Sequence, residues 1–127
     1  MKDLSLIKYF FSWLFILSML FPKMACSLNS DEIVIKYNLK QERELQKAVD
    51  DGHQPWRLNP IDVAHAAIIS YADKDVKYEK CSLIIQEKKE AVVQCDRDKI
   101  SYKIHLKKFF GKKSIWTAIK IQKIKTK

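Results

Sequence analysis

The spacing of apolar residues changes from a helical period to a period of two near Asp75. Before this point Leu45, Ala48 and Val49 repeat at helical spacing, with charged residues between them, and predict a helix over residues 39–51. After it, apolar residues alternate with their neighbours, which is typical of strands whose side chains point to opposite faces of a sheet. The pattern therefore predicts helices first and strands afterwards.

The first predicted helix has suitable residues at both ends, and the second has them at its start. Asn38 is a candidate N-cap for the first helix, and Gly52 a candidate C′ residue because glycine enters the left-handed region without steric cost. Asn59 and Pro60 predict the start of a second helix, since proline loses nothing at the first helical position. This second helix is expected to turn inward a stripe of Ile61, Ala64, Ile68 and Tyr71.

A hairpin with a candidate disulfide is predicted over residues 81–95. With the turn centred on Lys88, the expected facing pairs are Cys81 with Cys95, Leu83 with Val93, and Ile85 with Ala91. Cysteines directly opposite each other on neighbouring strands are close enough to form a disulfide. The alternative is two reduced thiols that pack as small apolar side chains.

Two further strands complete the predicted sheet. Residues 100–107 alternate strictly and place Lys103, His105 and Lys107 on one face. Residues 115–124 predict a last strand, with Ile115, Ile119 and Ile121 on one face and Trp116, Ala118 and Lys120 on the other. We expect an α+β fold, with N-terminal helices packed on a curved antiparallel four-stranded sheet. Residues 28–38 are predicted as a short strand or extended arm, and residues 39–127 as a single domain.

An export signal is predicted at the N-terminus. The apolar run of residues 9–21 follows Lys2 and Lys8 and precedes Pro22, which is the layout of a secretory signal peptide. A helix of this length rises only about 20 Å, less than the roughly 30 Å of a hydrocarbon core, so a retained span is disfavoured.

Cleavage is expected after Ser27, which places Ala25 and Ser27 at the two small-residue positions that a signal peptidase needs. The predicted signal peptide is therefore residues 1–27. Lipidation of Cys26 is the alternative, although Lys23 occupies the position where lipoprotein signals have an aliphatic residue. The protein is expected to be secreted or to stay at the cell surface.

Charge adds a candidate binding surface. The chain carries 24 Lys and Arg against 15 Asp and Glu, yet from Lys99 onward it contains lysines and no acid. The candidate residues for anionic partners are Lys103, His105, Lys107, Lys108, Lys112 and Lys113. Alternatively, these lysines serve solubility or protect an edge strand. Since lysine lacks the planar fork of arginine, no specific reading of nucleic acid is expected.

The segment between the helices is a second candidate. His53, Trp56 and Arg57 lie on a proline-fixed loop, and exposed Trp and Arg are the residue types that dominate binding hot spots. In the alternative interpretation, Trp56 packs into the helix–sheet core while Arg57 caps carbonyls or pairs with Asp50 or Asp51.

No catalytic or metal motif stands out. The three histidines, His53, His65 and His105, fall on a loop, a helix and a strand without metal-ligand spacing. His65 is expected to be a packing residue. No nucleophile or dinucleotide pattern is present, so neither a cofactor nor an enzyme activity is predicted.

The order of elements over residues 39–124 resembles the cystatin-like and NTF2-like layouts of many small exported domains. The string GHQPWRLNP at residues 52–60 is similar to a segment of small secreted Gram-positive proteins of unknown function. The resemblance implies export and a helix-on-sheet fold, and it brings no activity with it.

These observations predict a small exported, non-catalytic binding protein that acts at or outside the cell surface. Its basic C-terminal hairpin would hold an anionic surface polymer or a partner protein. The alternatives are an inhibitor or immunity-type protein that blocks an extracellular enzyme, and a small enzyme with an NTF2-like pocket. Membrane contact is expected only through the signal segment or a lipidated Cys26.

Overall fold

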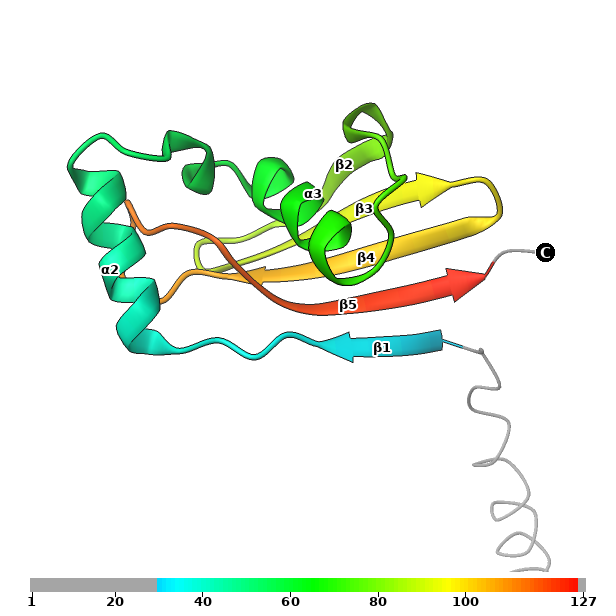
Figure 1. The fold of residues 1–127 in the computed structure, drawn as a ribbon, viewed down its shortest axis with the longest axis horizontal. Helices are drawn as coiled ribbons and strands as arrows, with labels where there is room; N and C mark the ends of the chain where they lie inside the picture. The colour runs from blue at the N-terminus through cyan, green and yellow to red at the C-terminus, as the bar shows by residue number, and fades with distance from the viewer. Residues whose placement is uncertain (1–29, 126–127) are drawn as a thin grey trace, which may run out of the picture.

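The computed structural model describes residues 30–125; the predicted signal peptide, its cleavage position and Cys26 lie outside the described residues. One antiparallel sheet has the strand order β1-β5-β4-β3-β2 (Figure 1). Its strands are β1 (Ser30–Val34), β2 (Cys81–Gln86), β3 (Glu90–Arg97), β4 (Ile100–Lys107) and β5 (Thr117–Lys125). The helices are α2 (Leu39–Asp50) and α3 (Pro60–Tyr71), with the short 3-10 helices η1 (Pro55–Leu58) and η2 (Tyr78–Lys80). The α+β class is confirmed.

The helix ends follow the predicted signals. The side chain of Asn38 accepts a hydrogen bond from the Lys40 amide at 2.9 Å, and that of Asn59 accepts one from the Ile61 amide at 3.0 Å. Gly52 has φ +88°, a backbone conformation that suits glycine at the end of a helix. Both caps and the glycine stop are therefore confirmed.

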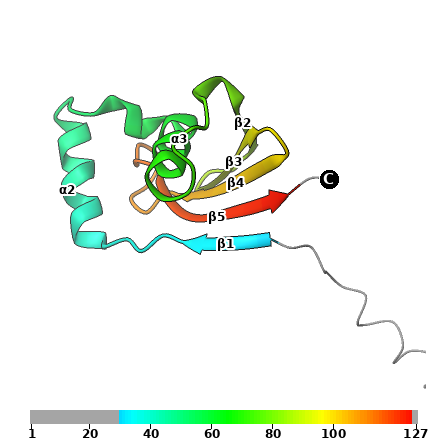
Figure 2. The same ribbon diagram turned by 45° about the vertical axis from the view of Figure 1, so that its right-hand side comes forward.

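Only α3 packs on the sheet. It lies across the face formed by β2 to β5, whereas α2 stands at the end of the sheet (Figures 1 and 2). The expectation that both helices cover the sheet is wrong for α2, because Val49 is its only buried residue. The inward stripe of α3 also differs from the prediction, since Tyr71 is 56% exposed. The buried residues of α3 are Pro60, Val63, Ala64, Ala67 and Ile68.

The sheet has five strands instead of the expected four. Residues 30–34 form β1, which pairs with β5 so that Ile33 lies opposite Ile121. Ile35, just beyond β1, is buried in the same core as Ile121. The segment predicted as a strand or arm is thus the edge strand of the domain, and β5 becomes an interior strand.

The β2–β3 hairpin confirms most of the predicted register. Cys81 lies opposite Cys95 and forms a disulfide with it, and Leu83 lies opposite Val93. The third expected pair is wrong, because a bulge after Leu83 shifts the register and places Ile85 opposite Val92. A bulge adds one residue to one strand, so every pair beyond it moves by one position.

A second bulge changes the facing of β5. The register shifts between His105 and Leu106, so that Leu106 lies opposite Ala118. Trp116 and Ala118 are consequently buried in the core, although the alternation predicted them on the other face from Ile121. Ile119, predicted on the same face as the buried Ile121, is only half-buried. One extra residue is enough to reverse the side-chain alternation.

A polar network closes the core at one end. The Asp73 side chain, 8% exposed, accepts hydrogen bonds from Arg97 and from the Tyr102 hydroxyl at 3.1 Å. Burial alone would raise the pKa of Asp73, but the hydrogen bonds from Arg97, the Asp75 amide and Tyr102 hold that pKa below its ordinary value. Burial raises the pKa of Tyr102, and the hydrogen bond to the Asp73 carboxylate raises it further. The network therefore keeps a charged carboxylate beside the apolar core.

Candidate functional site

Lysines from two separate loops meet at the end of the sheet nearest α2. The backbone amide of Lys108 donates to the carbonyl of Lys89 at 2.9 Å, which joins the loop after β4 to the β2–β3 turn. Lys107 also lies opposite Glu90 in the β3–β4 register. We call this surface the lysine cluster; it consists of Lys88, Lys89, Lys107, Lys108, Lys112 and Lys113.

The loop after β4, which carries Lys108, Lys112 and Lys113 of the cluster, has a fixed shape. The Gln46 side chain of α2 accepts a hydrogen bond from the Ile115 amide at 2.7 Å and donates to the Lys113 carbonyl at 3.2 Å. The ammonium group of Lys108 lies 4.6 Å from the centre of the Trp116 ring. Phe109 stacks on Tyr37, with ring centres 4.9 Å apart. The charged side chains are therefore presented from a folded loop anchored on α2.

The charge of the lysine cluster is largely uncompensated. Within residues 30–125, no carboxylate lies at ion-pair distance from any of its six ammonium groups. The acids of the same turn, Glu87 and Glu90, leave a formal excess of four positive charges. Such a concentration raises the local potential and attracts polyanions.

The face of β4 that was predicted to be basic is less charged than the lysine cluster. Lys103 and His105 point away from α3, but Lys103 lies between Gln94 and Gln122 on the neighbouring strands. His105 shares a hydrogen bond with the Gln122 side chain at 3.1 Å. On the same face Lys120 pairs with Glu32 at 3.4 Å. Lys103 and His105 thus lie on the same face of β4 as Lys107, as predicted, but their neighbours on the adjacent strands include glutamines and one ion pair.

The joint between the helices places Trp56 on the surface. Trp56 is 38% exposed, whereas Trp116, predicted on the face opposite Ile121, is buried in the core at 1%. The Arg57 guanidinium lies 4.5 Å from the centre of the Trp56 ring and donates through Nε to the Gln54 side chain at 2.7 Å. It forms no ion pair with Asp50 or Asp51 among the described residues. The interpretation of Trp56 as a core residue is therefore wrong.

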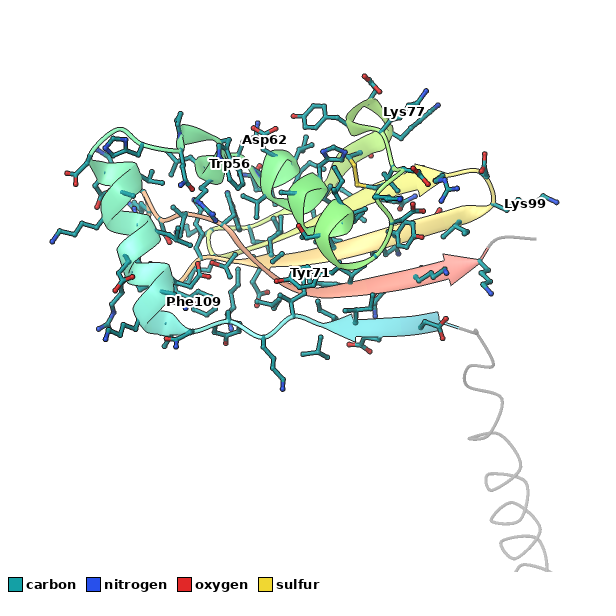
Figure 3. The ribbon with its side chains drawn as sticks, viewed as in Figure 1. Trp56, Asp62, Tyr71, Lys77, Lys99 and Phe109 are labelled. Carbon is teal, nitrogen blue, oxygen red and sulfur yellow. A yellow bond between two sulfur atoms is a disulfide. The ribbon has the colours of Figure 1, made fainter. Side chains whose placement is uncertain are left out.

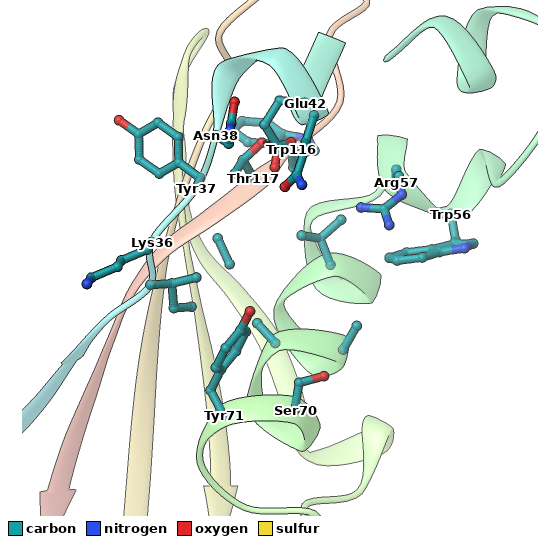
Figure 4. Close-up of a pocket in the computed structure, with 16 residues that line it drawn as sticks. Lys36, Tyr37, Asn38, Glu42, Trp56, Arg57, Ser70, Tyr71, Trp116 and Thr117 are labelled. Atoms are coloured by element: carbon teal, nitrogen blue, oxygen red, sulfur yellow. Dashed lines mark hydrogen bonds between the residues drawn. The ribbon is translucent and has the colours of Figure 1, made fainter. Parts of the chain in front are cut away.

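A pocket of about 320 Å³ opens beside Arg57 (Figure 4). It is bounded by the segment from β1 to α2, by η1, by the outer part of α3 and by the start of β5. Glu42 accepts a hydrogen bond from the Thr117 hydroxyl at 2.8 Å within this wall. Burial lowers the pKa of Arg57, and the negative charge of Glu42 opposes that effect. The pocket thus contains a partly desolvated cation and a carboxylate.

Comparisons with family models, curated proteins and solved structures find no match. The cystatin-like and NTF2-like resemblance therefore stays a prediction. No cluster of three or more His, Cys, Asp or Glu suited to a metal occurs in the described part of the chain. None of the helices within residues 30–125 is long and apolar enough to cross a membrane.

The two other histidines take no part in either surface. His65 bonds through Nε2 to the Val76 carbonyl at 2.9 Å and packs edge-on against Tyr78, as expected of a packing residue. His53 is exposed and does not line the pocket.

Sequence reasoning missed Lys88 and Lys89 as part of the basic surface. The sequence contained a signal for them. A turn at Asp98 places residue 90 opposite residue 107, so the β2–β3 turn with Lys88 and Lys89 lies next to the end of β4. For Glu42 and Thr117 no such signal exists, since their contact depends on where α2 docks.

Proposed function

We propose that this protein is an exported, non-catalytic binding protein that holds an anionic polymer or an acidic partner surface at its lysine cluster. The observation that carries the proposal is that the β2–β3 turn and the end of β4 with its following loop meet and bring together six lysines, none of which has a carboxylate at ion-pair distance in the described structure. Lysines act on such partners as mobile point charges, which suits repeating anionic groups better than one shaped ligand.

The position of the cluster argues against a purely protective role. The exposed sheet edges are β1 and β2. Four of the six lysines (Lys107, Lys108, Lys112 and Lys113) belong instead to the end of β4 and the loop that leads to β5, both interior strands. Protection of an edge strand does not explain lysines at this place.

The disulfide supports the proposed location. Disulfides persist in oxidising compartments, and the Cys81–Cys95 bridge is compatible with an extracellular protein. We accordingly propose that residues 1–27 act as a signal peptide cleaved after Ser27, which leaves the domain outside the cell.

Binding to immobilised polyphosphate at low and high salt tests the proposed function. Lys112→Glu/Lys113→Glu removes two contacts worth on the order of 1 kcal/mol each near an anionic surface, so affinity is expected to fall about 30-fold. The affinity of the wild type should also decrease steeply with salt, because screening weakens exposed charges.

The matched control is Lys74→Glu/Lys77→Glu, which makes the same change of charge on the connection between α3 and β2. Figure 3 shows Lys77 at the opposite side of the molecule from Phe109, which belongs to the loop of the cluster. Equal losses in both variants would show a dependence on net charge only and would refute a localised site. Salt-independent capture of a secreted hydrolase in a 1:1 complex would favour the inhibitor alternative.

A further inference from the structure

Arg57 is held in place by three separate contacts. Its Nε donates to Gln54 at 2.7 Å, its guanidinium lies over the Trp56 ring, and its carbonyl accepts a hydrogen bond from the Trp116 amide at 3.0 Å. Together these contacts fix both the backbone and the side chain. An arginine that is already immobile loses little conformational entropy when a ligand binds to it.

The two terminal nitrogens of Arg57 donate no hydrogen bond to any of the described residues. Glu42 is close enough to influence the guanidinium, yet the two groups do not form an ion pair. The pocket thus contains a cation and an anion with unoccupied space between them. Arg57 and Trp56 lie on one side of this space in Figure 4, with Tyr71 and Ser70 along another.

We propose that this pocket binds an α-amino carboxylate with an apolar side chain, either a free amino acid or the C-terminal residue of a peptide. The carboxylate of the ligand accepts hydrogen bonds from the two terminal nitrogens of Arg57, because the paired N–H groups of a guanidinium match the two oxygens of a carboxylate. The nitrogen on the α-carbon of the ligand, an ammonium group in a free amino acid and an amide N–H in a peptide, donates a hydrogen bond to the Glu42 carboxylate. The apolar side chain packs on Val63, Ala67 and Tyr71.

The charges of the pocket favour this class over a phosphate or a polyanion. Lys36 lines the pocket with its stem, but its ammonium group points away from the pocket in Figure 4. Arg57 and Glu42 then balance each other, so a dianion would meet the Glu42 carboxylate without a second cation. A ligand that has both a carboxylate and an N–H donor satisfies both groups.

The volume of the pocket agrees with one residue. About 320 Å³ lies at the lower end of ordinary small-molecule sites, and the pocket contains both aromatic surface and a few polar groups. This pocket contains none of the residues of the lysine cluster. The proposal of amino-carboxylate binding is therefore independent of the proposal of polyanion binding.

The test uses three probes: the tripeptide Gly-Gly-Phe, the same peptide with an amidated C-terminus, and free phenylalanine. Binding is followed by the NMR shifts of the indole N–H groups of Trp56 and Trp116, which both line the pocket. The free-carboxylate peptide or phenylalanine should shift these signals with saturation at millimolar concentrations, and amidation should weaken peptide binding at least tenfold. Stronger binding of the tripeptide identifies a peptide end as the source, and stronger binding of phenylalanine identifies a free amino acid.

Arg57→Gln should weaken binding at least tenfold, and Arg57→Lys should recover only part of it, because an ammonium group cannot form the paired contact. Arg43→Gln removes the same charge from the exposed side of α2, outside the pocket, and should leave binding unchanged. Glu42→Gln should weaken the binding of phenylalanine more than that of the tripeptide, since only the free amino acid has its ammonium group on the carbon that bears the carboxylate, where the tripeptide has a neutral amide N–H.

Three outcomes would overturn the proposal: equal binding of the amidated peptide, unchanged affinity in Arg57→Gln, or no saturable shift with any probe up to about 10 mM. The amidated peptide tests the carboxylate on the unaltered protein, so this result does not depend on how any variant folds.

Discussion

Removal of the Cys81–Cys95 disulfide should expose how much of the stability of the domain it supplies. The bridge joins positions 14 residues apart, and closing a loop of about 15 residues in the unfolded chain is worth about 3 kcal/mol. In Cys81→Ala/Cys95→Ala, the lost sulfur at the fully buried Cys95 adds about 1 kcal/mol. For a domain of this size we expect the melting temperature of this variant to fall by about 16 °C or more.

Urea unfolding, followed by circular dichroism, measures this loss in the oxidised wild type, the reduced wild type and the variant. Reduction should lower the free energy of unfolding by about 3 kcal/mol, and the variant should lose slightly more. The dependence on urea should steepen in both, since an unfolded chain without the bridge exposes more surface. An unchanged midpoint after reduction would refute the reasoning, because the hairpin would then be equally constrained without its bridge.

Two further substitutions test local features of the fold. Asp73→Asn should lower the free energy of unfolding by about 1.5 kcal/mol at pH 7, since it weakens the hydrogen bonds from the partly exposed Arg97 and from Tyr102. Because the folded-state pKa of Asp73 is lowered, this stabilisation is complete above about pH 4 and is lost as the pH falls through the folded pKa. Urea midpoints of wild type and variant should therefore converge in acid, and a constant difference would contradict the assignment. Gly52→Ala should cost about 1 kcal/mol in the same assay, although an added Cβ meets no atom within 4 Å, because φ is +88°. Gly52→Asn should cost less, and equal stability of all three proteins would show that this backbone conformation is not strained for alanine.

The elements that could be predicted from sequence are those determined by neighbouring residues. Asn59 followed by Pro60 specifies a helix start through its own side chain and ring, without help from the rest of the fold. The alternation around Lys88 likewise placed Cys81 opposite Cys95, because a hairpin register depends only on the turn and the apolar pattern.

The errors arise where distant segments decide the structure. Nothing within residues 30–34 indicates that the strand pairs with β5, since that partner lies at the other end of the chain. The register shift between His105 and Leu106 leaves one extra residue in β5, and this residue changes the face of the sheet on which Trp116 lies. The strict alternation of apolar residues in the sequence does not indicate such a bulge. The pocket at Arg57 was missed for the same reason, because Glu42 reaches it only through the docking of α2.

The pairing of β1 with β5 joins the two ends of the described chain. Ile33 pairs with Ile121, and Ser30 pairs with Ile124. The edge strand β1 can therefore join the sheet only after nearly the whole chain has been synthesised. β5 also carries Ile121 into the core between β4 and β1. Contacts between such distant segments form late in folding. If the chain is exported N-terminus first, as we propose, β1 cannot pair until β5 has also been translocated, so the sheet would be completed only after export.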